Sequence, residues 1–134
     1  MIGDAVAICE EAAVKLIARH PDLDSDGLRA LIHALGFDGF EPTHSWAPLV
    51  EIAAAGVTRA RALELLCADH GIAPAGVVAL RDAPNDLPVL RWAGHGLAVA
   101  NAHPAVLEAA DGVAPSNEDD GVAAVLKRLL GVIP

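Results

Sequence analysis

The second half of the chain alternates apolar segments with helical segments, and this order constrains the fold more than any other feature. Three short apolar segments predict strands, and each precedes a predicted helix: residues 77–80 before 87–93, 96–100 before 104–110, and 112–114 before 121–130. Strands that alternate with short helices are typical of a parallel sheet with crossover helices. We therefore expect an α/β fold with a partial Rossmann-like parallel sheet.

The first part of the chain follows a different pattern, in which strands dominate. The predicted elements are strands at 13–19, 40–46 and 49–55 and one helix at 28–35. We place a domain boundary near Gly56. Residues 1–55 then form a smaller α+β unit, and residues 56–134 carry the parallel sheet.

The chain is acidic, with 9 Lys and Arg residues against 18 Asp and Glu residues and a formal net charge of −9. Nucleic-acid binding needs a basic face, so we expect no nucleic-acid partner. Hydrophobic residues make up 54% of the chain, but no apolar run reaches the ~20 residues of a membrane span. The N-terminus lacks the basic start of a signal peptide, so we expect a cytoplasmic protein without a membrane partner.

Polar side chains follow the strand predicted at residues 77–80. Asp82, Asn85 and Asp86 lie between this strand and the next helix. Ligands of open α/β sheets gather at the carboxyl ends of strands, and carboxylates there suit a hard cation such as Mg²⁺. Alternatively, an aspartate in this place is simply a helix cap and binds no ligand.

Three other features favour a binding site over a simple cap. Arg59 lies at the start of the preceding helix, which Thr58 can cap, and it places a cation within reach of the same edge. Asn101 follows the second strand, and the polar run Ser116–Gly121 follows the third. Because the carboxyl ends of parallel strands meet at one edge of a sheet, we expect these loops to converge.

Another acidic run, Asp22–Gly27, admits three interpretations. It begins like a calcium-binding loop, but the twelfth position is His33 rather than Glu. It also contains the D-x-D pattern of an aspartyl phosphatase, but Pro21 stands where a buried strand should deliver the first aspartate. We favour a helix N-terminus with acidic residues in its first turn. For His44, we favour an ordinary loop role over one that faces a substrate.

Residues 56–123 resemble the C-terminal core of Cof-type haloacid-dehalogenase-like (HAD) phosphatases. Those enzymes carry, in order, G-V-[ST]-K-[GA], G-D-x-x-N-D, N-A and S-N-x-x-D-G-V-A. The matching residues here are Gly56–Ala60, Arg81–Asp86, Asn101–Ala102 and Ser116–Ala123. Residues 1–55 resemble the later part of that family's α/β cap domain, so the resemblance covers nearly all of the chain.

The resemblance implies a hydrolase that cleaves phosphate monoesters through an aspartyl-phosphate, with Mg²⁺ as cofactor. By matching position, Asp82 would bind Mg²⁺ directly, and Asp86 would hold a metal-bound water or a neighbouring group. Asn85 would help to position the phosphate or the nearby loop, and Arg59 stands where the family keeps a charge-stabilising lysine. The implied substrate is a small phosphorylated metabolite, with sugar phosphates as the expected class.

The sequence departs from the family in three respects. Arg59 replaces the lysine, and a planar guanidinium is not interchangeable with an ammonium group. Arg81 replaces a glycine and would crowd the site or add a positive charge. The nucleophile motif D-x-D-x-[TV] has no counterpart in the 134 residues. We therefore expect the chain to begin midway through the cap and to lack normal turnover by itself.

The main alternative is a degenerate, non-catalytic relative that serves binding or assembly. A small signalling receiver fits less well, because residues 1–55 have no place in it. In the family's sheet, the nucleophile strand lies beside the strand that carries Asp82. Without that neighbour, Val77–Leu80 would form an exposed apolar edge, and such an edge recruits another strand. We therefore expect a homo-oligomer that pairs across this edge.

Overall fold

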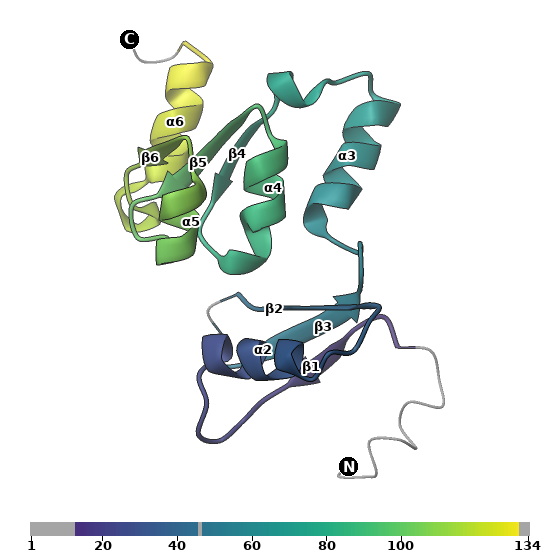
Figure 1. Ribbon diagram of the computed structural model, residues 1–134. Coiled ribbons are helices and arrows are strands. Elements are labelled where there is room, and N and C mark those ends of the chain that lie inside the picture. Colours follow the sequence, from purple (N-terminus) through teal and green to yellow (C-terminus); the bar gives the residue numbers. More distant parts are fainter. Residues whose placement is uncertain (1–12, 46, 132–134) are drawn as a thin grey trace.

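The computed structural model describes residues 13–45 and 47–131. These residues form two three-stranded sheets, one antiparallel and one parallel. Helix α3 (Arg59–Asp69) leads from the antiparallel sheet to the parallel one, and the two sheets lie at opposite ends of the molecule (Figure 1). Gly56, where we expect the domain boundary, lies between them and has a φ of +80°.

The antiparallel sheet has the strand order β1-β3-β2, with β1 at Leu16–Ala18, β2 at Phe40–Thr43 and β3 at Val50–Ala54. Helix α2 (Ser25–Ala34) lies against this sheet (Figure 1). Leu28 of the helix and Val50 of the central strand are buried. The apolar face of α2 therefore packs against the sheet, and the helix and the three strands form one small unit.

Helix α2 begins as the acidic run predicts. The Asp24 carboxylate accepts the N–H of Gly27 at 2.8 Å, which satisfies one of the free donors in the first turn. Asp26 lies within that turn, where a negative charge faces the positive end of the helix dipole. The favoured interpretation of Asp22–Gly27 as a helix start is therefore confirmed.

The parallel sheet has the order β4-β5-β6, with β4 at Val78–Arg81, β5 at His95–Val99 and β6 at Gly112–Ala114. The helices that accompany it are α3, α4 (Leu87–Trp92), α5 (Pro104–Ala109) and α6 (Gly121–Leu129). Single 3₁₀ turns occupy Pro74–Gly76, Pro84–Asp86 and Asn117–Asp119. The α/β fold with a parallel sheet and crossover helices is confirmed.

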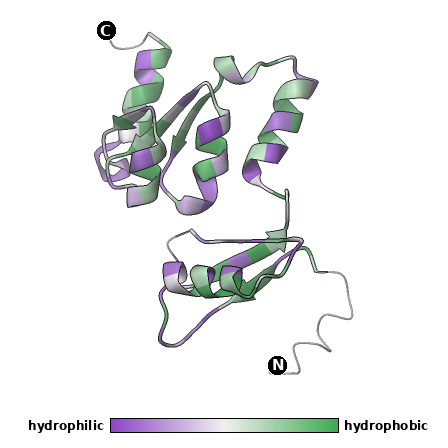
Figure 2. Ribbon diagram, in the orientation of Figure 1, coloured by the Kyte–Doolittle hydropathy of each residue, from purple (hydrophilic) through white to green (hydrophobic). Residues whose placement is uncertain are grey.

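The core of this larger unit consists of alanine, valine and leucine side chains from the sheet and its helices. One buried cluster is formed by Leu90, Ala98, Val99, Ala102 and Val106. A second contains Ala79, Val89 and Ala93. Helix α4 contributes Leu90 to the first cluster and Val89 to the second, so it packs against the sheet. Figure 2 shows hydrophilic and hydrophobic residues on each helix, as expected where one face packs and the other is exposed.

Strands β1 and β2 are at least three residues shorter than the sequence pattern predicts. Strand β2 ends at Thr43 rather than near residue 46, because His44 turns away and its carbonyl accepts the N–H of Asn85. Strand β1 pairs only over Leu16–Ala18. Trp46, and the first twelve residues of the expected cap segment, lie outside the described residues. Among the described residues, no helix is long and apolar enough to span a membrane.

Candidate active site

Three loops meet at the carboxyl edge of the parallel sheet. Asp82 directly follows β4, Asn101 follows β5, and Asn117 follows β6. The amide of Asn101 donates to Oδ1 of Asn117 at 2.6 Å, and the N–H of Asn117 donates to Oδ1 of Asn101 at 3.2 Å. The N–H of His103 donates to the carbonyl of Asp82 at 2.8 Å. The predicted convergence of these loops is therefore present, and hydrogen bonds connect all three.

Arg59 is the first residue of α3 and reaches the loop after β4. Its Nη1 lies 2.7 Å from Oδ1 of Asp86 and 3.2 Å from Oδ1 of Asn85. The Arg59 side chain is 55% exposed, whereas the Asp86 side chain is 6% exposed. A buried carboxylate needs a partner, so Asp86 fixes one side of the guanidinium while the rest remains accessible. Arg59 can thus present positive charge to an anion in front of the loop.

Arg81 places a second positive group beside Asp86. Its Nε lies 3.9 Å from Oδ1 of Asp86, and this Nε is buried without a hydrogen-bond partner among the described residues. The side chain is 30% exposed. We expect Arg81 either to crowd the site or to add a positive charge, and the geometry shows the added charge.

The oxygen donors at this edge suit a hard cation. Asp82 is exposed at the start of the loop, and carboxylate oxygens are the ligands that Mg²⁺ prefers. Asp86 is turned toward Arg59 and Arg81, so it is placed to orient neighbours rather than to bind a metal directly. Within residues 13–45 and 47–131, no group of three or more His, Cys, Asp or Glu side chains is arranged to hold a metal ion. Asp82 is the exposed carboxylate that this edge offers to a hard cation, and its role as a Mg²⁺ ligand stays a prediction.

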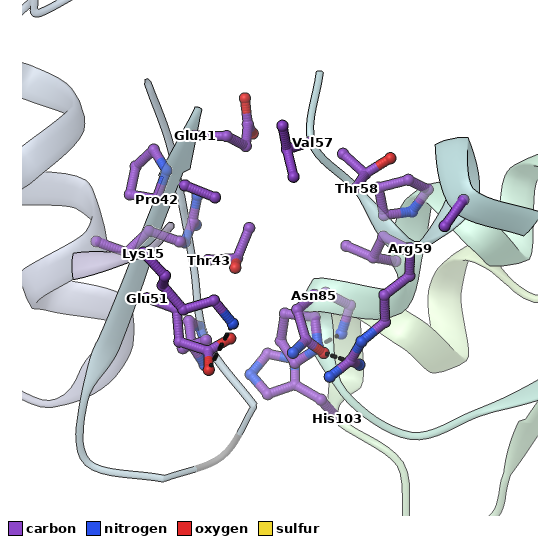
Figure 3. A pocket seen from close by; sticks show the side chains of 18 of the residues that line it. Lys15, Glu41, Pro42, Thr43, Glu51, Val57, Thr58, Arg59, Asn85 and His103 are labelled. Carbon is purple, nitrogen blue, oxygen red and sulfur yellow. Dashed lines mark hydrogen bonds and ion pairs between the residues drawn. The ribbon is translucent and has the colours of Figure 1, made fainter. Parts of the chain in front are cut away.

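A cavity of about 580 Å³ lies between the antiparallel sheet and the loop after β4. Figure 3 shows its two walls: Lys15, Thr43 and Glu51 face Arg59, Asn85 and His103. Lys15 and Glu51 form an ion pair of 3.1 Å. The volume falls within the usual range for small-molecule sites, which is about 300–1,000 Å³. The cavity is thus large enough for a small metabolite whose anionic group faces Arg59.

Asp26 of α2 connects the two units across this cavity. Its Oδ1 lies 3.1 Å from Nε2 of His44, and its Oδ2 lies 3.3 Å from Nε2 of His103. The rings of the two histidines are 5.9 Å apart and nearly perpendicular. His44 lies in the loop after β2, as expected, but it is only 2% exposed and its ring contacts Asp26.

The surroundings of Asp26 favour its ionised form. Partial burial raises its pKa, but the hydrogen bonds from His44 and His103 and the electrostatic attraction of these two side chains outweigh that effect. The net result is a pKa below the ordinary aspartate value of 3.8. Asp26 is therefore an anionic acceptor for both imidazoles at neutral pH.

The sequence and the fold agree on the family. The family model for haloacid dehalogenase-like hydrolases matches residues 7–126. The chain belongs to the haloacid dehalogenase-like hydrolases. The phosphoglycolate phosphatase of Methanopyrus kandleri is 32% identical over 114 residues, which are 85% of this chain and 49% of that protein. The 5-amino-6-(5-phospho-D-ribitylamino)uracil phosphatase YitU of Bacillus subtilis is 29% identical over 130 residues, which are 95% of this chain and 48% of that protein.

Solved structures of HAD-like proteins share the fold. A haloacid dehalogenase-like hydrolase of Bacillus subtilis superposes with a TM-score of 0.79 at 21% identity, over 96% of this chain and 46% of that chain. A phosphatase of the HAD enzyme superfamily from Bacteroides thetaiotaomicron gives a TM-score of 0.74 at 26% identity, over 96% of this chain and 46% of that chain. This HAD-like chain spans about half the length of the curated relatives described here.

The structure brings together most of the residues that the HAD motifs single out. Arg59, Asn85 and Asp86 are in direct contact, and Asp82 lies at the start of the same loop. Their catalytic and metal-binding roles stay predictions. The contact of Asp26 with His103 was not predicted, because 77 residues separate the two and no local pattern connects them.

Proposed function

We propose that this chain supplies the metal-binding and phosphate-binding half of a Mg²⁺-dependent phosphate-monoester phosphatase. The observation that carries the proposal is the contact of Arg59 with both Asn85 and Asp86 at the carboxyl edge of the sheet. Arg59 is a half-exposed cation that contacts the Asn85 amide, and the same loop carries the exposed carboxylate of Asp82. Membership of a hydrolase family that includes phosphatases supports the same chemistry.

Each residue has a defined part in the proposed reaction. Arg59 binds the anionic phosphoryl oxygens and stabilises the charge that grows on them in the transition state. Asp86 holds Arg59 in place, and Asn85 orients the phosphate through its side-chain amide. Asp82 is the Mg²⁺ ligand of this half. Bound Mg²⁺ would offset phosphate charge and align the phosphoryl group for attack.

The nucleophile is a separate requirement. The resemblance implies that an aspartate oxygen attacks phosphorus as the ester P–O bond breaks, and the leaving alkoxide takes a proton from the second aspartate of the D-x-D motif. That aspartate then takes a proton from water, which attacks the aspartyl-phosphate, releases inorganic phosphate and restores the carboxylate. No D-x-D-x-[TV] motif is found in the 134 residues. We infer that the attacking aspartate belongs on a strand beside β4, which is an edge strand among the described residues. We expect the chain to be inactive without it.

The proposed substrate is a small phosphorylated metabolite, with sugar phosphates as one candidate class. The cavity volume of about 580 Å³ supports a compact leaving group. The cavity wall opposite Arg59 carries the charged pair Lys15 and Glu51, which suits a polar leaving group. The relatives act on different phosphorylated compounds according to their names, phosphoglycolate among them.

A non-catalytic relative that serves binding or assembly is the second candidate. The observation that favours it is the second guanidinium at Asp86, because Arg81 stands where the family keeps a glycine. A carboxylate that faces two guanidinium groups is less free to order water around a metal. In that case the loop would be kept for its structure, and the proposed reaction would be absent.

Hydrolysis of p-nitrophenyl phosphate with Mg²⁺ tests the proposal. The chain is assayed alone and after addition of the nucleophile-bearing N-terminal half of a Cof-type relative, with Asp82→Ala as the control. We expect no turnover by the chain alone, turnover with the added half, and a loss of at least ~100-fold in Asp82→Ala. Turnover that appears only after Arg59→Lys and Arg81→Gly would favour the non-catalytic relative. Turnover that Asp82→Ala leaves unchanged would overturn the metal assignment.

A further inference from the structure

Two histidines hold the loop from Asp82 to Asp86 by its backbone. The N–H of His103 donates to the carbonyl of Asp82 at 2.8 Å, which fixes the start of the loop. The carbonyl of His44 accepts the N–H of Asn85 at 3.2 Å, which fixes its far end. The loop that carries the proposed metal and phosphate ligands is therefore held at both ends by histidines.

The side chains of the same two histidines share a single carboxylate. Oδ1 of Asp26 accepts from His44, and Oδ2 accepts from His103. Asp26 and His44 belong to the antiparallel-sheet unit, whereas His103 caps α5 beside the parallel sheet. One residue of α2 therefore reaches both ends of the loop, each through one histidine.

The hydrogen-bond pattern fixes which nitrogen donates. Nδ1 of His103 accepts the N–H of Ala105 at 3.2 Å, so its Nε2 carries the hydrogen and donates to Oδ2 of Asp26. Nε2 of His44 also faces the ionised carboxylate and must donate to it. Nδ1 of His44 is buried with no hydrogen-bond partner among the described residues. Asp26 is thus the side-chain partner that the structure gives to the His44 ring.

We propose that Asp26 is a positioning residue. It couples the packing of the antiparallel-sheet unit against the parallel-sheet unit to the geometry of the Asp82–Asp86 loop. When this unit sits against the parallel-sheet unit, the Asp26 carboxylate orients His44 and His103. These residues then set the backbone of Asn85 and Asp82. The consequence for phosphate hydrolysis rests on the proposed function, whereas the coupling itself does not.

The position of Asp26 makes the coupling testable by substitution. Its side chain is 54% exposed, so Asp26→Ala leaves no buried cavity. Asp26→Asn keeps the shape but offers one acceptor oxygen, so only one histidine can remain bound. Asp24→Ala is the matched control, because Asp24 caps the same helix through Gly27, whereas both histidines contact Asp26. It disturbs α2 while leaving the shared carboxylate in place.

Amide hydrogen exchange in the full 134-residue chain reports directly on the two backbone bonds. We expect Asp26→Ala to raise the exchange rates of the Asn85 and His103 amides by about ten-fold, with a smaller rise in Asp26→Asn. We expect amides of β5 to keep their rates in both variants. Asp24→Ala should leave the Asn85 and His103 amides within about two-fold of the parent chain.

Two results would overturn the proposal. Unchanged exchange of Asn85 and His103 in Asp26→Ala would show that the carboxylate does not hold the loop. An equal rise in Asp24→Ala would show that general loosening of α2, rather than the shared carboxylate, is responsible. A rise spread evenly over β5 would likewise indicate global destabilisation and count against the coupling.

A Mg²⁺ titration separates this proposal from the proposed function. The amide resonances of residues 82–86 are followed as MgCl₂ is added to the parent chain and to Asp26→Ala. We expect the variant to need about three to ten times more Mg²⁺ for the same shift, because second-layer changes commonly weaken metal binding by about ten-fold or more. No Mg²⁺-dependent shift in the parent chain would argue against the proposed metal site, while the exchange rates would still decide the role of Asp26.

Discussion

At the scale of single residues, Asp26 shows how one carboxylate links stability to pH. Its pKa lies below 3.8 in the folded chain, because the contacts with His44 and His103 outweigh the effect of partial burial. Arg29 of the same helix also faces it at 3.9 Å. A depressed carboxyl pKa stabilises the fold above the unfolded pKa, and this contribution is lost as pH falls through the folded pKa.

The prediction concerns the difference between the parent chain and Asp26→Asn. We expect the parent to be more stable at about pH 6 and this advantage to shrink below about pH 3.8. The advantage is small, because 54% of the Asp26 side chain is exposed and solvent screens its charge. Urea unfolding of both proteins at several pH values measures it. A difference that stays constant down to about pH 2.5 would contradict the assignment.

At the scale of secondary-structure elements, the loop before α6 needs a glycine. A Cβ on Gly121 would lie 1.9 Å from the carbonyl oxygen of Pro115 and 2.8 Å from that of Ser116. Both atoms belong to the backbone and cannot move aside cheaply. The N–H of Gly121 also donates to the Ser116 carbonyl at 2.9 Å. This glycine closes the turn that places Asn117 against Asn101.

We expect Gly121→Ala to destabilise the chain by about 1–3 kcal/mol, through overpacking against the backbone. Gly112→Ala is the control, because its Cβ would meet only the end of the Leu97 side chain at 3.3 Å. The midpoint of urea unfolding compares the two variants. Equal midpoints for Gly121→Ala and Gly112→Ala would show that the turn tolerates a side chain.

The order of elements was predictable, because each carries a local signal. The apolar periods mark β4, β5 and β6, and Thr58 and Asp24 cap helices as the sequence indicates. The early end of β2 was not predictable, because it depends on a hydrogen bond that the N–H of Asn85 donates to the carbonyl of His44. These two residues lie far apart in the sequence. The bridge through Asp26 was missed for the same reason: tertiary contacts between distant segments leave no local pattern.

At the scale of the whole molecule, strand β4 forms one edge of the parallel sheet. It pairs with β5 alone among the described residues, so one row of its backbone groups lacks a strand partner there. Three of its residues are apolar: Ala79 is buried, and Val78 and Leu80 are partly buried. Exposed large side chains of Leu65, Leu66 and Ile72 occur on α3 and directly after it. An apolar edge strand of this kind recruits a further strand.

We therefore predict that the chain self-associates through β4, which light scattering across the micromolar range would show. Val78→Lys should shift the population toward monomer, because a charged side chain blunts a strand edge. Val113→Lys places the same charge on β6, the other edge strand, and should leave the assembly intact. Because the proposed nucleophile strand would occupy the same side of β4, an added N-terminal half should also dissociate the oligomer. A monomeric parent chain, or an equal effect of Val113→Lys, would contradict pairing through β4.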